Sequence, residues 1–590
     1  MQCPLVQELS KLRKISSESV SHADFPDSID DFKQYLHVVR PVEEELINKL
    51  RALKENVHKR LFLLCGSAGD GKSHLLAYLK KNDVEQLLSG YTLYNDATES
   101  GSPSLTAIDT LAIRLAAFSD ECIDNDDDKS VIIAINLGML NAFVESDVGK
   151  EFSRLREYIE LNGILSEYGE GSEQKHDSVF CHVSFSDYQM FSLTEEGAYS
   201  PCLEELFSRI FTRDKDGRNR IFKKYIECDG RCTLINKCPV RHNFDFMRDP
   251  KVQKGVIAKI IATVIKDKMI ITMREILDFT YHIIVHDEFE RNDMQQKSAQ
   301  WIVFMSAYFS YSTPMLLYEY DGISQLISAL RTQDVLKVRS ETADEKTLSF
   351  YALDEVRENL SDLIQSTPYR FMLADEYRWA EIENDQSGLR TAAFKFSSRL
   401  NDVLHYNDNN LADTLLKDYL QLLYVLNTGR GNPRKLNEIT HNGVFSWDGI
   451  FGSDRICIDS TNEKFYILQK LELKPEPLIG QYYDKHKEVD RFSTILRVKM
   501  KSKLGLSESV VFDIDFSLFT LLNRISEGYR PTIQDRNTHA DFVSAIEMLT
   551  AFGDKDEQVF LLPKGEAVYK HIVIGISVYD DGYEFMVVED

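Results

Sequence analysis

A glycine-rich loop between an apolar run and an amphipathic stretch constrains this chain more than any other feature. The loop consists of Gly66, Ser67, Ala68, Gly69, Asp70, Gly71, Lys72 and Ser73. It fits the pattern G-x-x-x-x-G-K-[ST] without a mismatch. Residues 61–65 are apolar and predict a buried strand, whereas Leu75, Leu76 and Leu79 share one face of a predicted helix. A strand, this loop and a helix in succession are the context of a phosphate-binding P-loop.

The chemistry of such a loop follows from its backbone. Glycines let the chain curl so that N–H groups point at phosphate oxygens, and the helix start adds a partial positive charge there. In this arrangement Lys72 reaches the β- and γ-phosphates, and the Ser73 hydroxyl binds Mg²⁺. The alternative, a Gly-rich turn that binds nothing, is disfavoured because motif and context agree. ATP and Mg²⁺ are therefore the expected ligands.

The composition is that of an ordinary soluble globular protein. With 590 residues the chain is long enough for three or four domains, and it is 43% hydrophobic and 28% charged. No stretch approaches the ~20 apolar residues of a membrane span, and the N-terminus lacks a signal pattern. Nine cysteines, an odd number, argue against a secreted disulfide framework. We expect a cytoplasmic protein without membrane contact.

The charge limits how the chain can contact DNA. Its net charge of −25 excludes broad phosphate binding by the general surface. DNA contact would need a partner protein or a local basic strip, and the best strip is residues 496–501, with sequence LRVKMK. Its alternation at period 2 predicts a strand with one basic face. We favour a solvated strand face there over a DNA-binding surface.

The order of predicted elements indicates an α/β core followed by helical and mixed regions. Strand candidates at 91–95, 131–135 and 179–185 alternate with helical patterns around 104–118 and 138–161. This alternation predicts an AAA-like parallel sheet covered by helices. The expected regions are a helical lead-in (1–58), a P-loop NTPase core (59–195), a helical lid region with a cysteine cluster (196–290), a helical domain (291–454) and a C-terminal α/β domain (455–590).

Hydrolysis needs an acid that holds Mg²⁺ and a polar group that places water. Asp96 follows the strand candidate at 91–95 and is the predicted Mg²⁺ ligand, while Glu99 could polarise the water. The equal alternative for this pair is a helix cap and turn. Asn136 ends the next strand candidate and resembles the "sensor 1" position of AAA-like ATPases. Asp96, Glu99 and Asn136 are thus the catalytic candidates.

Other polar residues compete for roles at this site. Residues 283–288 (IIVHDE) match an apolar run followed by two acids, but a helical pattern runs into them, so we interpret them as a decoy. Arg274 begins a lid-like helix, and Arg434 resembles a "sensor 2" helix start. We favour structural roles for both arginines. No nuclease motif is recognised.

A cysteine cluster is the remaining candidate site. Cys228, Cys232, Cys238 and His242 have the spacing C-x₃-C-x₅-C-x₃-H. Three thiolates and one imidazole can form a closed tetrahedral zinc site. The spacing is not that of a standard knuckle, and metal-free cysteine-rich loops of helical regions are the favoured alternative. Any zinc bound here would be structural.

Several short segments occur in an order that suggests a known family. They are residues 32–38 (FKQYLHV), 40–43 (RPVE), 66–76 with Asp70 in the loop, 94–100 (YNDATES), 134–140 (AINLGML), Cys238-Pro239 with Asn243, and 527–531 (EGYRP). Together they resemble the DptF (DndF) family, the ATPase-like component of DNA phosphorothioation-dependent restriction. The matches extend over most of the chain.

The resemblance implies a function in antiphage defence. A member would act with the family's G and H subunits to restrict DNA that lacks phosphorothioate, and it would contact DNA through that complex. Lys72 and Ser73 carry over onto the family's P-loop. An ATP-dependent regulator or a scaffold with little hydrolysis is the alternative. The oligomeric state is open, a homo-oligomer included.

Overall fold

The structure, a computed structural model, divides into two compact units, Met1–Ser192 with Ala198–Ala412, and Leu193–Gly197 with Asp413–Asp590. The residues that it describes are 3–18, 31–54, 59–95, 105–125, 130–165, 179–228, 232–319, 324–338, 344–345, 348, 356–374, 379, 388–406, 413–449, 451–459, 461–479, 488–502, 509–552, 559–564, 570–576 and 583–589. In this part of the chain no helix is both long and apolar enough to cross a membrane.

A parallel sheet forms the centre of the N-terminal part of unit 1. Its strands are β1 (Leu61–Cys65), β2 (Tyr91–Tyr94), β3 (Ser130–Ile135) and β4 (Phe180–Ser184). Their spatial order is β2-β3-β1-β4, and every pairing is parallel. In the register, Cys65 lies opposite Ile135 on β3 and Ser184 on β4. The predicted parallel sheet is confirmed, and the chain leaves β1 at its carboxyl edge to enter the glycine loop.

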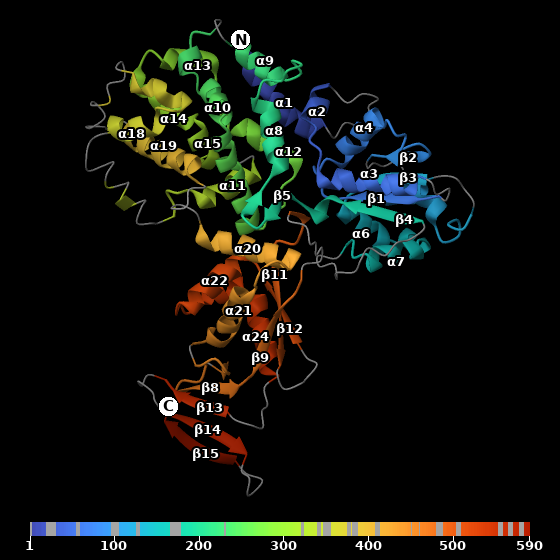
Figure 1. The fold of residues 1–590 in the computed structure, drawn as a ribbon, viewed down its shortest axis with the longest axis vertical. Coiled ribbons are helices and arrows are strands. Elements are labelled where there is room, and N and C mark those ends of the chain that lie inside the picture. The colour runs from blue at the N-terminus through green and yellow to red at the C-terminus, as the bar shows by residue number, and fades with distance from the viewer. Residues whose placement is uncertain are drawn as a thin grey trace. The chain divides into compact units, whose positions relative to one another are not determined.

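Helices cover both faces of this sheet (Figure 1). They are α3 (Pro41–Leu53), α4 (Lys72–Asn82), α5 (Ala107–Leu115), α6 (Leu137–Glu145) and α7 (Ser153–Leu161). Alternate residues of β1 serve the two faces: Leu61 and Leu63 pack with α5, α6 and α7, whereas Phe62 and Leu64 pack with α3 and α4. A strand buried on both sides must be apolar throughout, which explains the uninterrupted apolar run before the loop.

The rest of unit 1 is mainly helical, as expected. Its first helices are α1 (Pro4–Glu18) and α2 (Asp31–Leu36). Two short strands, β5 (Tyr188–Thr194) and β6 (Gly197–Tyr199), follow the parallel sheet, and the residues where they adjoin, Leu193–Gly197, belong to unit 2. The later helices are α8 (Pro201–Phe211), α9 (Arg220–Glu227), α10 (Pro239–Met247), α11 (Pro250–Asp267), α12 (Met273–His282), α13 (Arg291–Lys297), α14 (Trp301–Ser310), α15 (Thr313–Glu319), α16 (Gln325–Leu330), α18 (Val356–Ile364) and α19 (Leu389–Leu404).

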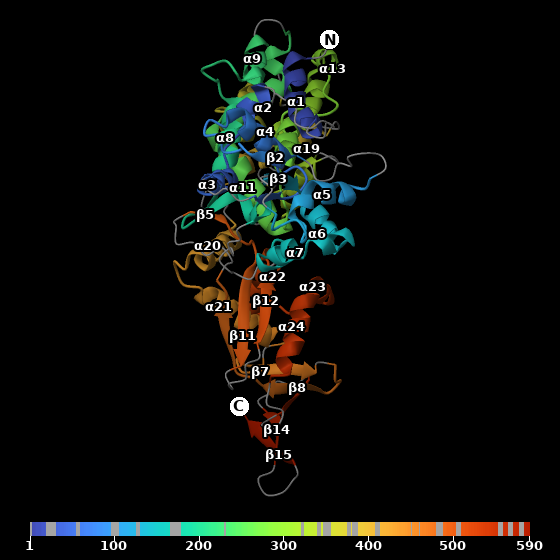
Figure 2. The same cartoon turned by 90° about the vertical axis from the view of Figure 1, so that its right-hand side faces the viewer.

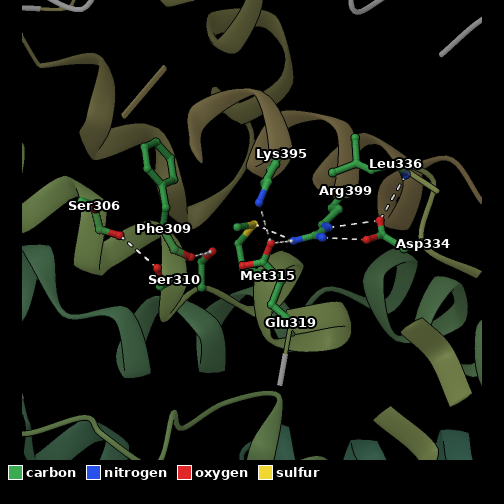
Figure 3. Close-up of polar contacts among 10 residues, drawn as sticks. Ser306, Phe309, Ser310, Met315, Glu319, Asp334, Leu336, Lys395 and Arg399 are labelled. Carbon is green, nitrogen blue, oxygen red and sulfur yellow. Dashed lines mark hydrogen bonds and ion pairs between the residues drawn. The ribbon is translucent and has the colours of Figure 1, made fainter. Parts of the chain in front are cut away.

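A buried charge network links α15, α19 and the segment that follows α16 (Figure 3). The Arg399 guanidinium on α19 donates two hydrogen bonds to Asp334, from Nε at 3.2 Å and from Nη2 at 2.6 Å. Its Nη1 lies 2.8 Å from the Glu319 carboxylate at the end of α15 and 3.2 Å from the Met315 sulfur. Arg399 and Asp334 are almost inaccessible to solvent. A bidentate pair satisfies both groups, which burial otherwise makes costly.

Unit 2 combines helices with antiparallel sheets. Its helices are α20 (Thr414–Thr428), α21 (Arg434–Ser446), α22 (Phe516–Ser526), α23 (Ile533–Thr538) and α24 (Ala540–Thr550). Its strands are β7 (Arg455–Asp459), β8 (Phe465–Lys470), β9 (Leu473–Pro477), β10 (Val489–Arg491), β11 (Leu496–Ser502), β12 (Ser509–Ile514), β13 (Val559–Pro563), β14 (Lys570–Ile576) and β15 (Tyr583–Glu589). One sheet has the order β12-β11-β9 and a second has the order β15-β14-β13-β8-β7, whereas β10 belongs to a third sheet with the order β10-β5-β6. Helix α24 packs along β12 (Figure 2).

The main segment of this unit begins at Asp413, whereas the C-terminal α/β domain expected from the order of predicted elements begins at 455. Helices α20 and α21 account for the difference, because α21 packs against β9 and α22 of the same unit. The last two strands, β14 and β15, form an antiparallel pair.

The basic strip at 496–501 is strand β11, with the predicted alternation. Leu496, Val498 and Met500 are fully buried. On the other face, Arg497 Nε lies 3.0 Å from Asp513 on β12, and Lys501 pairs with Glu476 on β9. Neighbouring strands thus supply carboxylates to two of its three cations, which lowers the positive charge available to a phosphate backbone.

Candidate nucleotide site

The glycine loop, residues 66–73, has a backbone that only glycine adopts readily. Gly66, Gly69 and Gly71 have φ values of 155°, 97° and 96°. A Cβ atom on Gly66 would lie 2.7 Å from the Asp70 carboxylate and 2.9 Å from Cβ of Phe185. Gly71 is the N-cap of α4, so the loop leads directly into the amino-terminal end of a helix. Such a helix end favours an anion.

Asp70 and Arg40 hold the shape of the loop. The Asp70 carboxylate accepts a hydrogen bond from the Ser67 N–H, and Arg40 Nη2 donates to the Asp70 main-chain carbonyl at 2.7 Å. The Arg40 guanidinium lies 4.6 Å from the centre of the Phe185 ring. Burial raises the pKa of Asp70, and Lys72, the Ser67 N–H and Arg40 oppose the shift. Burial also lowers the pKa of Arg40.

Lys72 folds back over the loop. Its Nζ donates hydrogen bonds to the carbonyl oxygens of Gly66 at 2.9 Å and Ser67 at 2.7 Å. The two carbonyl oxygens thus accept hydrogen bonds from the Lys72 ammonium group, which has three donors and no acceptor. A phosphate at the loop would offer the same ammonium group stronger, charge-assisted partners. The position of Lys72 therefore suits a side chain that exchanges loop carbonyls for phosphate oxygens.

The end of β2 meets the loop at Ser73. The Ser73 hydroxyl donates to the main-chain carbonyl of Asn95 at 3.1 Å. In the part of the chain that the structure describes, the Asn95 side-chain oxygen Oδ1 is buried and has no hydrogen-bond partner. A buried acceptor without a donor costs free energy unless a ligand or water satisfies it. Asp96 and Glu99, the predicted metal ligand and water-polarising group, lie outside the described residues.

Asn136 lies at the same edge of the sheet, and its side chain caps a helix through a hydrogen bond. It directly follows Ile135, which pairs with Cys65, the residue before the glycine loop. Asn136 is the N-cap of α6, and its Oδ1 accepts from the Met139 N–H at 2.6 Å. The cap occupies one lone pair of the side-chain oxygen, and the NH₂ group is the part of the side chain that can donate to a phosphate.

The helix α12 brings two residues against the loop. A Cβ atom on Gly69 would lie 3.2 Å from the Thr272 hydroxyl and 3.3 Å from Cβ of Arg274. Thr272 and Glu275 form a capping box that fixes this end of α12. Arg274 is therefore adjacent to the loop. In the sequence, Thr272 begins a T-x-x-E capping pattern, but local spacing carries no sign that this helix start meets the glycine loop.

The competing acidic motif lies elsewhere. Residues 283–285 are buried directly after the end of α12 rather than in a strand, as the helical pattern predicted. Asp287 accepts a hydrogen bond from Arg13 Nη1 at 3.2 Å. Arg434 is the first residue of α21 and belongs to unit 2.

A histidine cluster beside the loop was missed by the sequence patterns. His74 follows Ser73 directly, and its Nε2 lies 3.1 Å from Nδ1 of His37. Nε2 of His37 lies 3.0 Å from the Glu43 carboxylate, and the His37 ring stacks on Tyr78. Burial, and then the neighbouring His37, lower the pKa of His74 to about 4. The residue after the motif therefore stays uncharged near neutral pH.

Two of the four predicted zinc ligands, Cys228 and His242, have other partners in the structure. The thiols of Cys3 and Cys228 are hydrogen-bond partners, which lowers the pKa of Cys3 to about 6 and raises that of Cys228. His242 instead places Nδ1 2.7 Å from the Tyr308 hydroxyl, and its ring packs on Phe371. Burial lowers the pKa of His242 to about 4. Among the described residues, no group of three or more Cys, His, Asp or Glu is already arranged as a metal site.

A cavity of about 640 Å³ lies in the helical part of unit 1. It is lined by residues between His286 and Glu319, among them Lys297, Ser310 and Tyr311, and by none of residues 66–73. This cavity is therefore separate from the glycine loop.

Comparison with known proteins found no matching family model, no similar curated protein and no similar solved structure.

Proposed function

We propose that this chain is the ATP-binding and ATP-hydrolysing subunit of a DNA phosphorothioation-dependent restriction system, acting with that system's G and H subunits against unmodified DNA. The observation that carries the enzymatic part is the contact between Ser73 Oγ and the main-chain oxygen of Asn95. It joins the hydroxyl of the glycine loop to the end of the strand that precedes Asp96 in sequence. The restriction system enters through the resemblance to the DptF family.

The residues at the loop fit a Mg²⁺–nucleotide. Three glycines with positive φ shape the loop, and a Cβ atom at Gly66 would clash with Asp70 and Phe185. The Asn95 Oδ1 atom is a buried acceptor still in need of a donor among the described residues, and a metal-bound water would supply one. Lys72 and the N–H groups of the loop would hold the phosphates, and Ser73 and Asp96 would hold Mg²⁺. The bound ion would neutralise charge on the β- and γ-phosphates.

The roles in hydrolysis then follow from position. Glu99 would orient and polarise water, and the Asn136 NH₂ group would contact the γ-phosphate or that water. Arg274, which lies against Gly69, would be the nearest cation contributed by α12. Catalysis of phosphoryl transfer rests mainly on positioning and charge, which such a set can supply without covalent chemistry.

The alternative is an ATP-dependent switch or scaffold with little intrinsic turnover. It is favoured by the absence of an acid at the end of β3, where Asn136 stands in place of a carboxylate. An Asp96→Asn variant separates the two functions. If the chain is an ATPase, this variant loses turnover and keeps nucleotide binding.

The test is steady-state ATP hydrolysis by the purified full chain, with and without modified and unmodified duplex DNA. Lys72→Ala is expected to abolish turnover and Mg²⁺-dependent ATP binding. Lys80→Ala, an exposed lysine on the same helix, is the matched control and should behave as the wild type. Turnover that survives in Lys72→Ala would contradict the proposal. If ATP binds without turnover, the assay is repeated with the G and H subunits, and continued inactivity there would favour the switch.

A further inference from the structure

The loop before α9 and the first turns of α9 concentrate positive charge on an otherwise acidic chain. Residues 213–224, which we call the basic segment, contain six cations and two acids, whereas the whole chain has a net charge of −25. The cations are Arg213, Lys215, Arg218, Arg220, Lys223 and Lys224. Five of them are exposed, and Lys224 is partly buried. The segment is therefore a local exception to the charge of the general surface.

A buried asparagine holds the loop of the basic segment in one shape. Asn219 is the N-cap of α9, and its Oδ1 accepts a hydrogen bond from the Phe222 N–H at 3.0 Å. Its NH₂ group lies 2.8, 3.0 and 2.9 Å from the main-chain oxygens of Arg209, Ile210 and Thr212. The Asp214 carboxylate also accepts from the Arg218 N–H at 2.8 Å. Because the backbone is fixed, a ligand that binds the cations does not have to order the loop.

Helix α9 has one basic side and one apolar side. Arg220, Lys223 and Lys224 are three and four residues apart, so they share one side of the helix. The apolar side is buried and consists of Ile221, Phe222 and Tyr225. A basic amphipathic helix that binds a membrane must insert its apolar side into the lipid. That side of α9 is already packed inside the protein, which argues against a membrane as the partner.

Half of the cations in the basic segment keep their charge available to a ligand. In the part of the chain that the structure describes, Arg213, Lys215 and Lys223 have no ion-pair partner. Arg218 Nη2 lies 3.0 Å from Asp216, and Lys224 lies 2.7 Å from Glu227. On β11, in contrast, neighbouring strands supply carboxylates to two of the three cations. The basic segment is therefore better suited than β11 to a polyanion.

We propose that the basic segment binds the phosphate backbone of duplex DNA. Contacts of lysine and arginine with phosphates supply the sequence-independent part of DNA binding. The only aromatic ring of the segment, Phe222, is buried, so the segment lacks the stacking surface with which proteins hold single strands. Its other large apolar side chain, Ile221, is buried as well, whereas a protein interface has an apolar centre.

The contact would belong to this chain itself rather than to a partner protein. The acidic general surface repels DNA, so binding through the basic segment should be modest in affinity and should weaken steeply as salt is added. This inference rests neither on ATP hydrolysis nor on the proposed restriction system, because DNA binding is measured without nucleotide and without other subunits.

The first experiment titrates the full chain with a short fluorescent duplex DNA at several salt concentrations. The triple variant Arg213→Gln, Lys215→Gln and Lys223→Gln removes the three cations without ion-pair partners. Each lost phosphate contact reduces the slope of log affinity against log salt by ~0.9, so the wild type should lose ~40-fold more affinity than the variant between about 50 and 200 mM salt.

The matched control removes the same charge from β11, as Arg497→Gln, Lys499→Gln and Lys501→Gln, and should keep the wild-type slope. Asp216→Asn frees Arg218 from its ion pair and should tighten binding. A wild type that does not bind the duplex at low salt would overturn the proposal, and so would equal losses in the two triple variants. Tighter binding of a single strand of the same sequence would contradict the assignment to duplex DNA.

A second measurement needs no variant. Acetylation of Lys215 and Lys223, mapped by mass spectrometry, should fall when the duplex is added, whereas Lys150, an exposed lysine outside the segment, should react equally with and without DNA. Unchanged acetylation of Lys215 and Lys223 would exclude the segment as the site. Polyglutamate or phosphatidylserine vesicles should displace the duplex poorly, and displacement as effective as that by unlabelled duplex would assign the surface to an acidic protein or a membrane instead.

Discussion

Nη2 of Arg40 lies 2.7 Å from the main-chain carbonyl oxygen of Asp70, so the residue that caps α3 also holds the glycine loop. The two residues come from different elements, and the contact links the loop to the helix that covers its sheet. The Arg40 side chain also lies close to Gly71, where a Cβ atom would be 3.4 Å from Nη2. The loop is therefore shaped by a long-range cation as well as by its own glycines.

Replacing Arg40 by methionine should weaken nucleotide binding. The variant keeps much of the side-chain volume but leaves the Asp70 carbonyl without its charged donor. Hydrogen bonds from charged groups contribute ~1.5–3 kcal/mol, which corresponds to ~10- to 100-fold in Kd. Titration with a fluorescent ATP analogue measures the change. Arg51→Met, which breaks an exposed pair with Glu85, is the control and should bind as the wild type. Unchanged affinity in Arg40→Met would show that the contact is dispensable.

Substitutions at Asn136 should separate its cap from its predicted role at the phosphate. Asn136→Ala removes the hydrogen bond to the Met139 N–H and should cost ~1 kcal/mol of stability. Asn136→Ser keeps an N-cap oxygen and should unfold near the wild-type temperature, yet it lacks the NH₂ group. We expect ATP turnover to fall in both variants. Wild-type turnover in the serine variant would assign Asn136 to the cap alone.

The protein should lose stability in acid through His74. Its pKa is about 4 in the folded state, lowered chiefly by burial, against ~6.5 when unfolded. Below pH ~6.5 the unfolded chain binds a proton that the folded chain does not, so stability falls as the pH drops toward 4. The shift corresponds to about 3 kcal/mol at most. Thermal unfolding between pH 8 and 4 should show a shallower decline in His74→Gln. His405→Gln, at an exposed position, should follow the wild-type curve.

Breaking the buried pair of Arg399 and Asp334 should be strongly destabilising. Arg399→Met leaves the Asp334 carboxylate buried without its bidentate partner, a loss of ~3–5 kcal/mol. The double variant Arg399→Met with Asp334→Leu should recover part of this loss, because no buried charge remains. Denaturant unfolding of unit 1 measures both. If the double variant is as unstable as the sum of the two single ones, the pair does not interact as the structure indicates.

Local patterns in the sequence were sufficient to predict the glycine loop and the strand and helix on either side of it. The apolar run at 61–65, the loop at 66–73 and the helix that follows lie where their patterns predicted, because backbone preference and period act over a few residues. The parallel arrangement of four strands also followed from the alternation of strands and helices. Period-2 alternation identified β11 and its buried side.

Only the tertiary structure decided which distant residues meet. The donor to Asp70 is Arg40, the acceptor for Ser73 is a main-chain oxygen of Asn95, and the thiol beside Cys228 is Cys3 rather than a neighbour in sequence. These contacts depend on strand order and on how helices pack, and neither is encoded in local spacing. Spacing placed His242 among the predicted zinc ligands, whereas the tertiary structure sets its ring nitrogen 2.7 Å from the Tyr308 hydroxyl. The sequence determined the position of the loop and of the strand and helix beside it, and long-range packing determined what surrounds the loop, because residues far apart in the chain meet only through tertiary contacts.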